Sequence, residues 1–156
     1  MNEKVIIRDA NHKDILDIKN IHVQSIKQIN SKDYTPRQIR AVTKNRTVKR
    51  YKYLMKMGEK FFVVTRVNKI VGFCSIKKNE IVKLYVHPKE MLKGIGAKLL
   101  MHIEKYAKKN KIKEIILKST TTAMNFYTKK RYRIVRKAKH VRNGVSMPVI
   151  WMEKKL

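Results

Sequence analysis

The stretch that most constrains the fold runs from Glu80 to Leu100 and reads EIVKLYVHPKEMLKGIGAKLL. A short apolar strand is followed by a break at Pro88, a glycine-rich turn and an amphipathic helix predicted over residues 95–109. Gly94 and Gly96 have no Cβ, so backbone N–H groups there can approach a ligand closely. A helix N-terminus also offers unpaired N–H donors and partial positive charge, so this turn is predicted to bind phosphate.

Two widespread phosphate-binding loops do not account for this turn. The chain contains no GxxxxGK[ST] string, which excludes a P-loop. The dinucleotide fingerprint GxGxxG fails at its third glycine, where Leu99 stands. A GxG pair by itself is also compatible with a tight turn that has no ligand.

The apolar patterns and turn residues predict one α/β domain of the α+β type over residues 1–156. The expected element order is β-α-α-β-β-β-α-β-α-β-β. The predicted strands cover residues 5–8, 61–67, 70–77, 80–86, 114–118, 132–138 and 146–153, and the helices cover residues 11–29, 36–57, 95–109 and 122–130. Turns are expected at Asn68-Lys69, at Lys78-Asn79 and around Asn143-Gly144.

Two motifs in the expected order resemble the GNAT superfamily of N-acetyltransferases. The first is a strand ending in V-x-P, then Gln/Arg-x-x-Gly-x-Gly/Ala and a helix beginning with two leucines, matched here by residues 84–100. The second, A-x-x-F-Y-x-K-x-G-F, is matched by residues 123–132, AMNFYTKKRY. The resemblance implies a mixed sheet of about seven strands flanked by about four helices. It also implies acetyl-CoA as co-substrate, no metal, and direct acetyl transfer to an amine.

The chain departs from the family pattern at two positions. Met91 replaces the usual Gln or Arg, which predicts the loss of one polar contact to the pyrophosphate. Arg131 replaces a glycine, and because non-glycine residues tolerate positive φ poorly, we expect that turn to be rebuilt.

The resemblance also assigns site residues. In the family the strand before the phosphate helix splays from its neighbour, and the pantetheine arm lies in the gap. The residues predicted to contact the cofactor are Leu84, Tyr85, Val86, Met91, Leu92, Lys93, Gly94, Ile95, Gly96 and Ala97.

Acetyl transfer requires removal of a proton from the amine, stabilisation of the developing oxyanion, and a proton donor for the thiolate. Tyr127 occupies the family position of that donor, and a phenol stays protonated at neutral pH. By resemblance to the histone-acetylating branch of the superfamily, in which a glutamate opens the equivalent strand, Glu80 is the first candidate for the base, directly or through water. Each also has a structural alternative, a packed aromatic and a solvated hairpin glutamate. The resemblance also implies that a backbone N–H of residues 84–86, first of all that of Val86, donates to the oxyanion.

His87, just before Pro88, is a further candidate for a catalytic role, with an exposed polar residue as the alternative. His22 on the first helix is expected either to face the acceptor site or to lie on the surface, and His140 is expected in the loop between the last two strands. The resemblance places the acceptor pocket between residues 30–34 and residues 140–146, the second segment being expected as a loop. Residues 22–39 are faintly similar to YafP-type bacterial acetyltransferases, which does not identify a substrate.

The charge of the chain is extreme, with 39 Lys and Arg against 11 Asp and Glu and a formal net charge of +28. No acidic residue lies between Glu114 and Glu153, so the C-terminal half can attract polyanions, although a compositional bias would look the same.

The lone Cys74 in an apolar run is expected to be a buried thiol. With no signal peptide or apolar span in evidence, we expect a cytoplasmic location and no membrane contact.

Two other readings remain open at this stage. One is a basic nucleic-acid- or ribosome-associated protein with a GNAT-like fold and no catalysis. The other is a regulatory domain that binds acetyl-CoA without turnover. A homodimer is also possible, since family members often pair.

Overall fold

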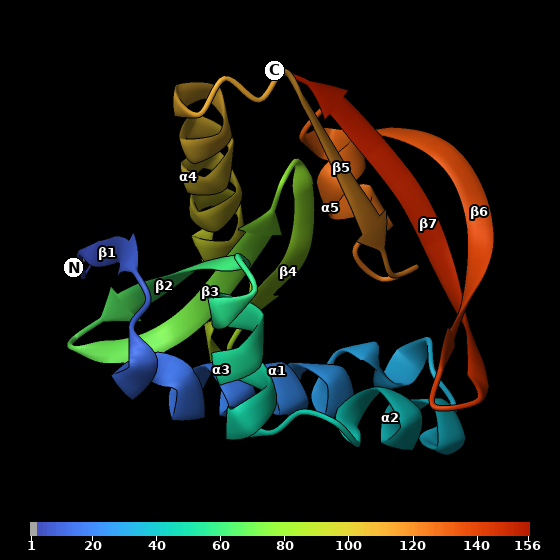
Figure 1. Cartoon of the computed structure of the whole chain (residues 1–156). Helices are drawn as coiled ribbons and strands as arrows, with labels where there is room; N and C mark the ends of the chain where they lie inside the picture. Colours follow the sequence, from blue (N-terminus) through green and yellow to red (C-terminus); the bar gives the residue numbers. More distant parts are fainter. Residues whose placement is uncertain (1–2) are drawn as a thin grey trace.

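The computed structural model describes residues 3–156 and contains seven strands and five α-helices (Figure 1). The strands are β1 (Val5–Asp9), β2 (Lys60–Arg66), β3 (Lys69–Lys77), β4 (Glu80–Val86), β5 (Glu114–Ser119), β6 (Arg133–Arg142) and β7 (Val145–Lys155). The helices are α1 (Ile15–Gln28), α2 (Pro36–Thr43), α3 (Val48–Lys56), α4 (Ile95–Lys109) and α5 (Met124–Lys129). Three short 3₁₀ helices, η1 (His12–Asp14), η2 (Asn30–Lys32) and η3 (Pro88–Glu90), join them.

All strands belong to one mixed sheet in the order β1-β2-β3-β4-β5-β7-β6. Neighbouring strands are antiparallel except for β4 and β5, which run parallel. That parallel pairing includes only Glu80 with Ile116 and Ile81 with Leu117. Beyond these two pairs the strands separate, which is the splay that the family resemblance implied.

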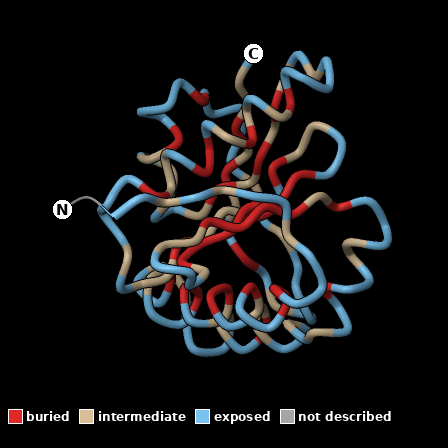
Figure 2. Tube along the Cα trace, turned by 90° about the vertical axis from the view of Figure 1, so that its left-hand side faces the viewer, coloured by how far each residue is buried: buried red, intermediate tan, exposed pale blue. Residues whose placement is uncertain are grey.

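The sheet has a hydrophobic layer on each face. Alternate residues of β2 serve opposite faces: Phe62 and Val64 pack in the cluster that contains α4, while Phe61 and Val63 pack with α1 and α3. Figure 1 shows α1, α2 and α3 along one side of the sheet and α4 on the other. The buried residues accordingly run through the middle of the molecule, as Figure 2 shows.

Close packing of α4 on the sheet depends on Gly72 in β3. A Cβ at this position would lie 3.0 Å from the carbonyl oxygen of Tyr85 and 3.3 Å from a methyl of Leu99. The first neighbour is backbone of the adjacent strand and Leu99 is fully buried in α4, so a larger residue would push the helix away. Gly72 therefore sets how closely α4 packs on β3, and with it the position of the glycine turn that precedes α4.

The predicted fold class is confirmed, with one extra helix. The segment predicted as one helix over residues 36–57 forms α2 and α3, because Thr47 accepts a hydrogen bond from the Arg50 N–H and begins a new helix. The first hairpin turn is formed by Val67-Asn68 rather than Asn68-Lys69, and both residues have positive φ, of 48° and 60°.

The last two strands are longer than predicted. His140 lies in β6 opposite Met147, not in a loop, and only Asn143-Gly144 separates β6 from β7. Both turn residues have positive φ, of 47° and 74°, which suits a two-residue hairpin turn with Asn-Gly. The expected loop over residues 140–146 is therefore the tip of a hairpin.

The turn at Arg131 is not rebuilt, contrary to our expectation. Arg131 adopts the left-handed conformation with φ of 69°. The Tyr132 N–H donates to the Tyr127 carbonyl at 3.1 Å, and the Arg131 N–H donates to the Thr128 carbonyl at 3.0 Å. This pair of bonds is the Schellman ending that glycine usually provides, so here an arginine in a strained conformation ends the helix in the same way.

No helix among residues 3–156 has the length and apolar character needed to cross a membrane. Cys74 is buried in the core, as expected, and burial raises the pKa of its thiol.

Candidate active site

The glycine turn presents a set of free backbone donors. Gly94, with φ of 76°, precedes α4 and supplies no side-chain cap. The first intrahelical hydrogen bond runs from the Lys98 N–H to the Gly94 carbonyl at 3.1 Å. The N–H groups of residues 95–97 therefore have no acceptor within the helix, and the helix dipole adds partial positive charge at the same point. Such a site fits a phosphate group.

The free edge of β4 faces the gap that opens between β4 and β5. The His87 N–H donates to the Val71 carbonyl at 2.8 Å, and Val86 lies opposite Gly72. Since hydrogen-bonded pairs alternate along antiparallel strands, the backbone groups of Leu84 and Val86 point away from β3. The Val86 carbonyl accepts a hydrogen bond from the buried Ser25 hydroxyl at 3.0 Å. This leaves the N–H groups of Leu84 and Val86 directed toward the gap.

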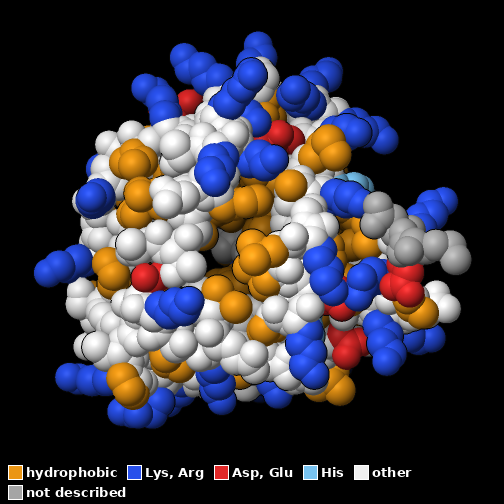
Figure 3. Space-filling view, turned by 180° about the vertical axis from the view of Figure 1, so that it is seen from behind, with side chains coloured by type: hydrophobic (Ala, Val, Ile, Leu, Met, Phe, Trp, Pro, Cys, Tyr) orange, Lys and Arg blue, Asp and Glu red, His pale blue; other side chains and the backbone are white. Residues whose placement is uncertain are grey.

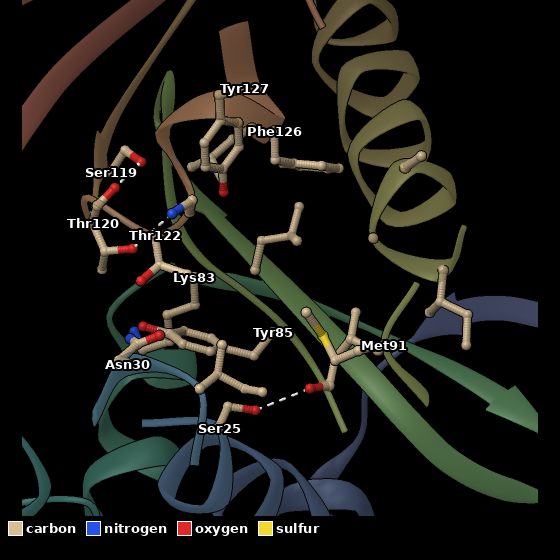
Figure 4. A pocket seen from close by; sticks show the side chains of 18 of the residues that line it. Ser25, Asn30, Lys83, Tyr85, Met91, Ser119, Thr120, Thr122, Phe126 and Tyr127 are labelled. Atoms are coloured by element: carbon tan, nitrogen blue, oxygen red, sulfur yellow. Dashed lines mark hydrogen bonds between the residues drawn. The ribbon is translucent and has the colours of Figure 1, made fainter. Parts of the chain in front are cut away.

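A first cavity of about 540 Å³ occupies this gap and reaches the start of α4. Its wall is mostly apolar, and on the face shown in Figure 3 the molecule is hollowed near its centre, with hydrophobic side chains around the hollow and Lys and Arg further out. Tyr127 lines the cavity from α5, with its hydroxyl directed inward (Figure 4). The ring is buried between Phe126 and Tyr132, and burial raises the pKa of Tyr127, so the phenol remains a donor at neutral pH.

The structure brings together most of the residues that were predicted to contact the cofactor. Lys93 is the exception, because its ammonium group lies 3.1 Å from a carboxylate oxygen of Glu90 and it does not line the cavity. The nine that line the first cavity are Leu84, Tyr85, Val86, Met91, Leu92, Gly94, Ile95, Gly96 and Ala97.

A second cavity of about 480 Å³ adjoins the first and shares seven lining residues with it. Both segments expected to surround the acceptor contribute to it, Asn30 and Tyr34 from one and His140 and Arg142 from the other. Asp33 accepts a hydrogen bond from the Thr122 N–H at 2.8 Å, which ties the first segment to the strand-to-helix connection before α5.

Glu80 lines the second cavity and Tyr127 the first, so the two candidate catalytic residues lie in adjoining spaces. The Glu80 carboxylate is partly exposed and lies 3.6 Å from the Lys118 ammonium group. His140 also lines the second cavity, and its pKa is lowered by burial and by the nearby charges of Arg142 and Lys118.

The other histidines have different surroundings. His22 lines the second cavity but is buried, with Nδ1 2.6 Å from the Tyr51 hydroxyl, and burial holds its pKa well below the usual value. His87 lines neither cavity, and its ring accepts a hydrogen bond from the Lys89 N–H at 3.1 Å. This places His87 in a structural role at the start of η3.

A bulge in β4 orients the residues of the second cavity. Ile81 pairs with Ile76 and Lys83 pairs with Ser75, which leaves Val82 as an extra residue. Glu80 and Lys83 are three positions apart, so along a regular strand they would lie on opposite faces of the sheet, and the extra residue changes this. With it, both line the second cavity, while Ile81 packs in the core beneath α4.

A buried ion pair that the sequence did not indicate lies at this point. The Lys83 ammonium group lies 2.6 Å from the Glu59 carboxylate, which also accepts a hydrogen bond from the Ser75 hydroxyl at 2.5 Å. Burial lowers the pKa of Lys83, and Glu59 opposes that shift. Lys83 lines both cavities and Glu59 lines the second, so the pair fixes the wall between them. The residues are 24 positions apart, and no local pattern indicates the contact.

Comparison with known proteins assigns the family. A profile for the acetyltransferase (GNAT) domain matches residues 30–156, most of the chain. The chain belongs to the GNAT family of acetyltransferases. As a member it is an acyl-CoA-dependent N-acetyltransferase, which confirms the resemblance and the class of enzyme. No curated protein sequence matches the chain.

Solved structures show the same fold. A protein from Rhodopseudomonas palustris described as a GCN5-related N-acetyltransferase is 24% identical, with a TM-score of 0.90 over 100% of this chain and 99% of that one. The PaiA N-acetyltransferase of Thermoplasma acidophilum, solved with coenzyme A, is 21% identical, with a TM-score of 0.78 over 98% and 99% of the two chains. YncA of Salmonella typhimurium, a putative acetyltransferase solved with acetyl-CoA, is 16% identical, with a TM-score of 0.70 over 97% and 93%. These comparisons do not show the YafP likeness.

Proposed function

We propose that this chain binds acetyl-CoA in the first cavity and transfers the acetyl group directly to an amine that enters through the second. The observation that supports this most strongly is the combination of free N–H donors at residues 95–97 with a splayed β4–β5 gap. The first feature fits a pyrophosphate, and the second offers backbone partners to an extended pantetheine arm. Two adjoining cavities allow both substrates to be bound at once, without a covalent enzyme intermediate.

Bound acetyl-CoA supplies an acetyl group activated as a thioester. Glu80, directly or through water, accepts the proton that the amine loses as its nitrogen bonds to the carbonyl carbon. The Val86 N–H, which faces the gap, donates to the carbonyl oxygen as negative charge develops there. The Tyr127 hydroxyl protonates the sulfur as the carbon–sulfur bond breaks. Glu80 gains one proton and Tyr127 loses one, and proton exchange through water returns both side chains to their starting states, so the overall reaction is balanced.

The test compares two glycines with the same backbone conformation. Gly94 and Gly144 have φ of 76° and 74°, and a Cβ at either position would meet no atom within 4 Å. Valine at each site therefore introduces the same backbone strain, but only Gly94 lines the first cavity. We expect CoA to raise the melting temperature of the wild type and of Gly144→Val by mass action, and to have little effect on Gly94→Val.

Titration calorimetry with CoA provides the second measurement. Failure of the folded wild type to bind CoA or acetyl-CoA would contradict the proposal directly. Equal loss of binding in both valine variants would instead attribute the effect to strain and remove the support that the glycine turn gives.

A further inference from the structure

The second cavity carries far more positive than negative charge. Seven basic side chains and two acidic ones, Glu59 and Glu80, line it. Glu59 pairs with Lys83, and Glu80 lies beside Lys118. The five basic residues left without a carboxylate partner among residues 3–156 are Arg46, Arg50, Lys77, Lys78 and Arg142.

Three of these, the arginines, come from parts of the chain that the fold holds together. Arg46 lies between α2 and α3, Arg50 lies in the first turn of α3, and Arg142 ends β6. Asn143, next to Arg142, donates through its side chain to the Ala41 carbonyl at 2.6 Å. Its side-chain oxygen also accepts a hydrogen bond from Asn45, next to Arg46, at 3.3 Å. Figure 1 shows the resulting contact between the tip of the β6–β7 hairpin and α2.

The conformation of Arg46 is fixed from within its own segment. Its Nε donates to the Val42 carbonyl at 3.0 Å, which leaves the terminal guanidinium nitrogens available. The pKa of Arg142 is lowered, mainly by desolvation and also by the positive charge of Arg46, because the two guanidinium groups repel one another. The first turn of α3 contains Arg50 and no acidic residue, although a helix N-terminus favours negative charge. The proximity of Arg46 to Arg142 and the lack of negative charge at the start of α3 are both unfavourable unless an anion is present.

We propose that the acceptor is a small amine that also carries an oxyanion, either a carboxylate or a phosphate, which Arg46, Arg50 and Arg142 bind. This inference rests on the proposed acetyltransferase function and specifies its substrate class. Guanidinium groups match the geometry of both oxyanions and can form two parallel hydrogen bonds to either. The amine end of such a molecule is drawn toward Glu80, whose carboxylate lies 3.6 Å from the Lys118 ammonium group, a longer separation than the 2.6 Å between Glu59 and Lys83.

The size and charge of the cavity favour this class over others. A cavity of about 480 Å³ is suited to a small molecule. The amine of that molecule would reach the thioester across the wall that the two cavities share. A diamine or polyamine would place its second ammonium group among the unpaired arginines, where like charges repel.

The experiment uses matched acceptor pairs with acetyl-CoA. L-Alanine is compared with L-alaninamide, and phosphoethanolamine with ethanolamine, over a range of pH so that equal amounts of free amine are compared. We expect kcat/KM to favour the anionic member of at least one pair by about 10- to 100-fold, the usual effect of one or two charge-assisted hydrogen bonds. The two pairs distinguish a carboxylate acceptor from a phosphate one.

The variants Arg46→Gln and Arg142→Gln test the residues. Each is expected to raise KM for the preferred anionic acceptor about tenfold or more and to leave its uncharged partner unaffected. Arg37→Gln is the control, because Arg37 is exposed on α2 and lines neither cavity. Binding is also measured without turnover, by titrating each acceptor into protein saturated with CoA.

The outcomes separate the two proposals. If CoA binds but no anionic acceptor binds or reacts better than its uncharged partner, the substrate class is wrong and the acetyltransferase function stands. Unchanged discrimination in both arginine variants, with normal melting temperatures, would also overturn it. Absence of CoA binding would overturn both.

Discussion

Replacement of Tyr127 by phenylalanine separates a catalytic hydroxyl from a packed aromatic ring. The ring lies 5.1 Å from that of Phe126 and 5.7 Å from that of Tyr132, centroid to centroid, and phenylalanine preserves both contacts. The hydroxyl faces the first cavity and has no hydrogen-bond partner within residues 3–156 (Figure 4). Its removal therefore leaves no unsatisfied group behind and is expected to change the free energy of unfolding by less than about 0.5 kcal/mol.

The effect on catalysis should be much larger. Loss of a general acid typically lowers turnover by about 10²–10⁴-fold, or about 3–5 kcal/mol of transition-state stabilisation. Affinity for acetyl-CoA should change little, because a proton donor for the thiolate acts only as the carbon–sulfur bond breaks. The assay follows thiol release with an acceptor found by screening, and reports kcat and KM alongside thermal melts.

Tyr132→Phe is the matched control. The Tyr132 hydroxyl donates to the Glu104 carboxylate at 2.9 Å, away from the first cavity, so this variant should lose about 1–3 kcal/mol of stability and keep its turnover. Tyr127→Ala should lose about 3–5 kcal/mol of stability through the space it leaves. Wild-type turnover in Tyr127→Phe, with chemistry rate-limiting, would refute the reasoning and leave water as the simpler proton source.

Three further predictions address other parts of the molecule. Met91→Gln should tighten CoA binding by about 0.5–1.5 kcal/mol in calorimetry, and unchanged affinity would show that the turn needs no further donor. Arg131→Gly should raise the free energy of unfolding by about 0.5–1 kcal/mol, since it relieves a φ of 69°, and a lower melting temperature would exclude strain there. The paired hydrogen bonds from Arg8 lower the pKa of Asp14, so this contribution to stability is present above the unfolded-state pKa and lost as pH falls through the lower folded value. The stability difference between wild type and Asp14→Asn should therefore shrink from pH 7 to pH 2 in denaturant titrations, and a constant difference would contradict it.

The local patterns of the sequence predict most of the fold. Alternating apolar residues locate the strands, and the Pro88 break with Gly94 and Gly96 locates the start of α4 within a residue. These features are local because propensity, capping and turn chemistry act over a few positions. The break between α2 and α3 was also marked locally, by Thr47 as a second N-cap, and was missed within a run of basic residues.

The sequence does not predict contacts between distant segments, and the second cavity consists largely of such contacts. Gln38 of α2 donates to the Ser146 carbonyl at 2.9 Å across 108 positions, and Asn143 reaches Ala41 across 102. These bonds bring Arg46 and Arg142 to one cavity, although neither residue stands in a recognisable motif. The strongly basic composition makes these two arginines harder to recognise as site residues, because basic residues are frequent throughout the sequence.

The bulge at Val82 explains why alternation alone would have misplaced the candidate base. Along an unbroken strand Glu80 shares a face with Leu84 and Val86, which pack beneath α4, and would point away from the acceptor. The extra residue reverses the alternation between Ile81 and Lys83, so that Glu80, Lys83 and Tyr85 all line the second cavity. The bulge lies just beyond the last β4–β5 pair, at Ile81 and Leu117. The same short segment thus ends the parallel pairing that opens the first cavity and turns the candidate base toward the second.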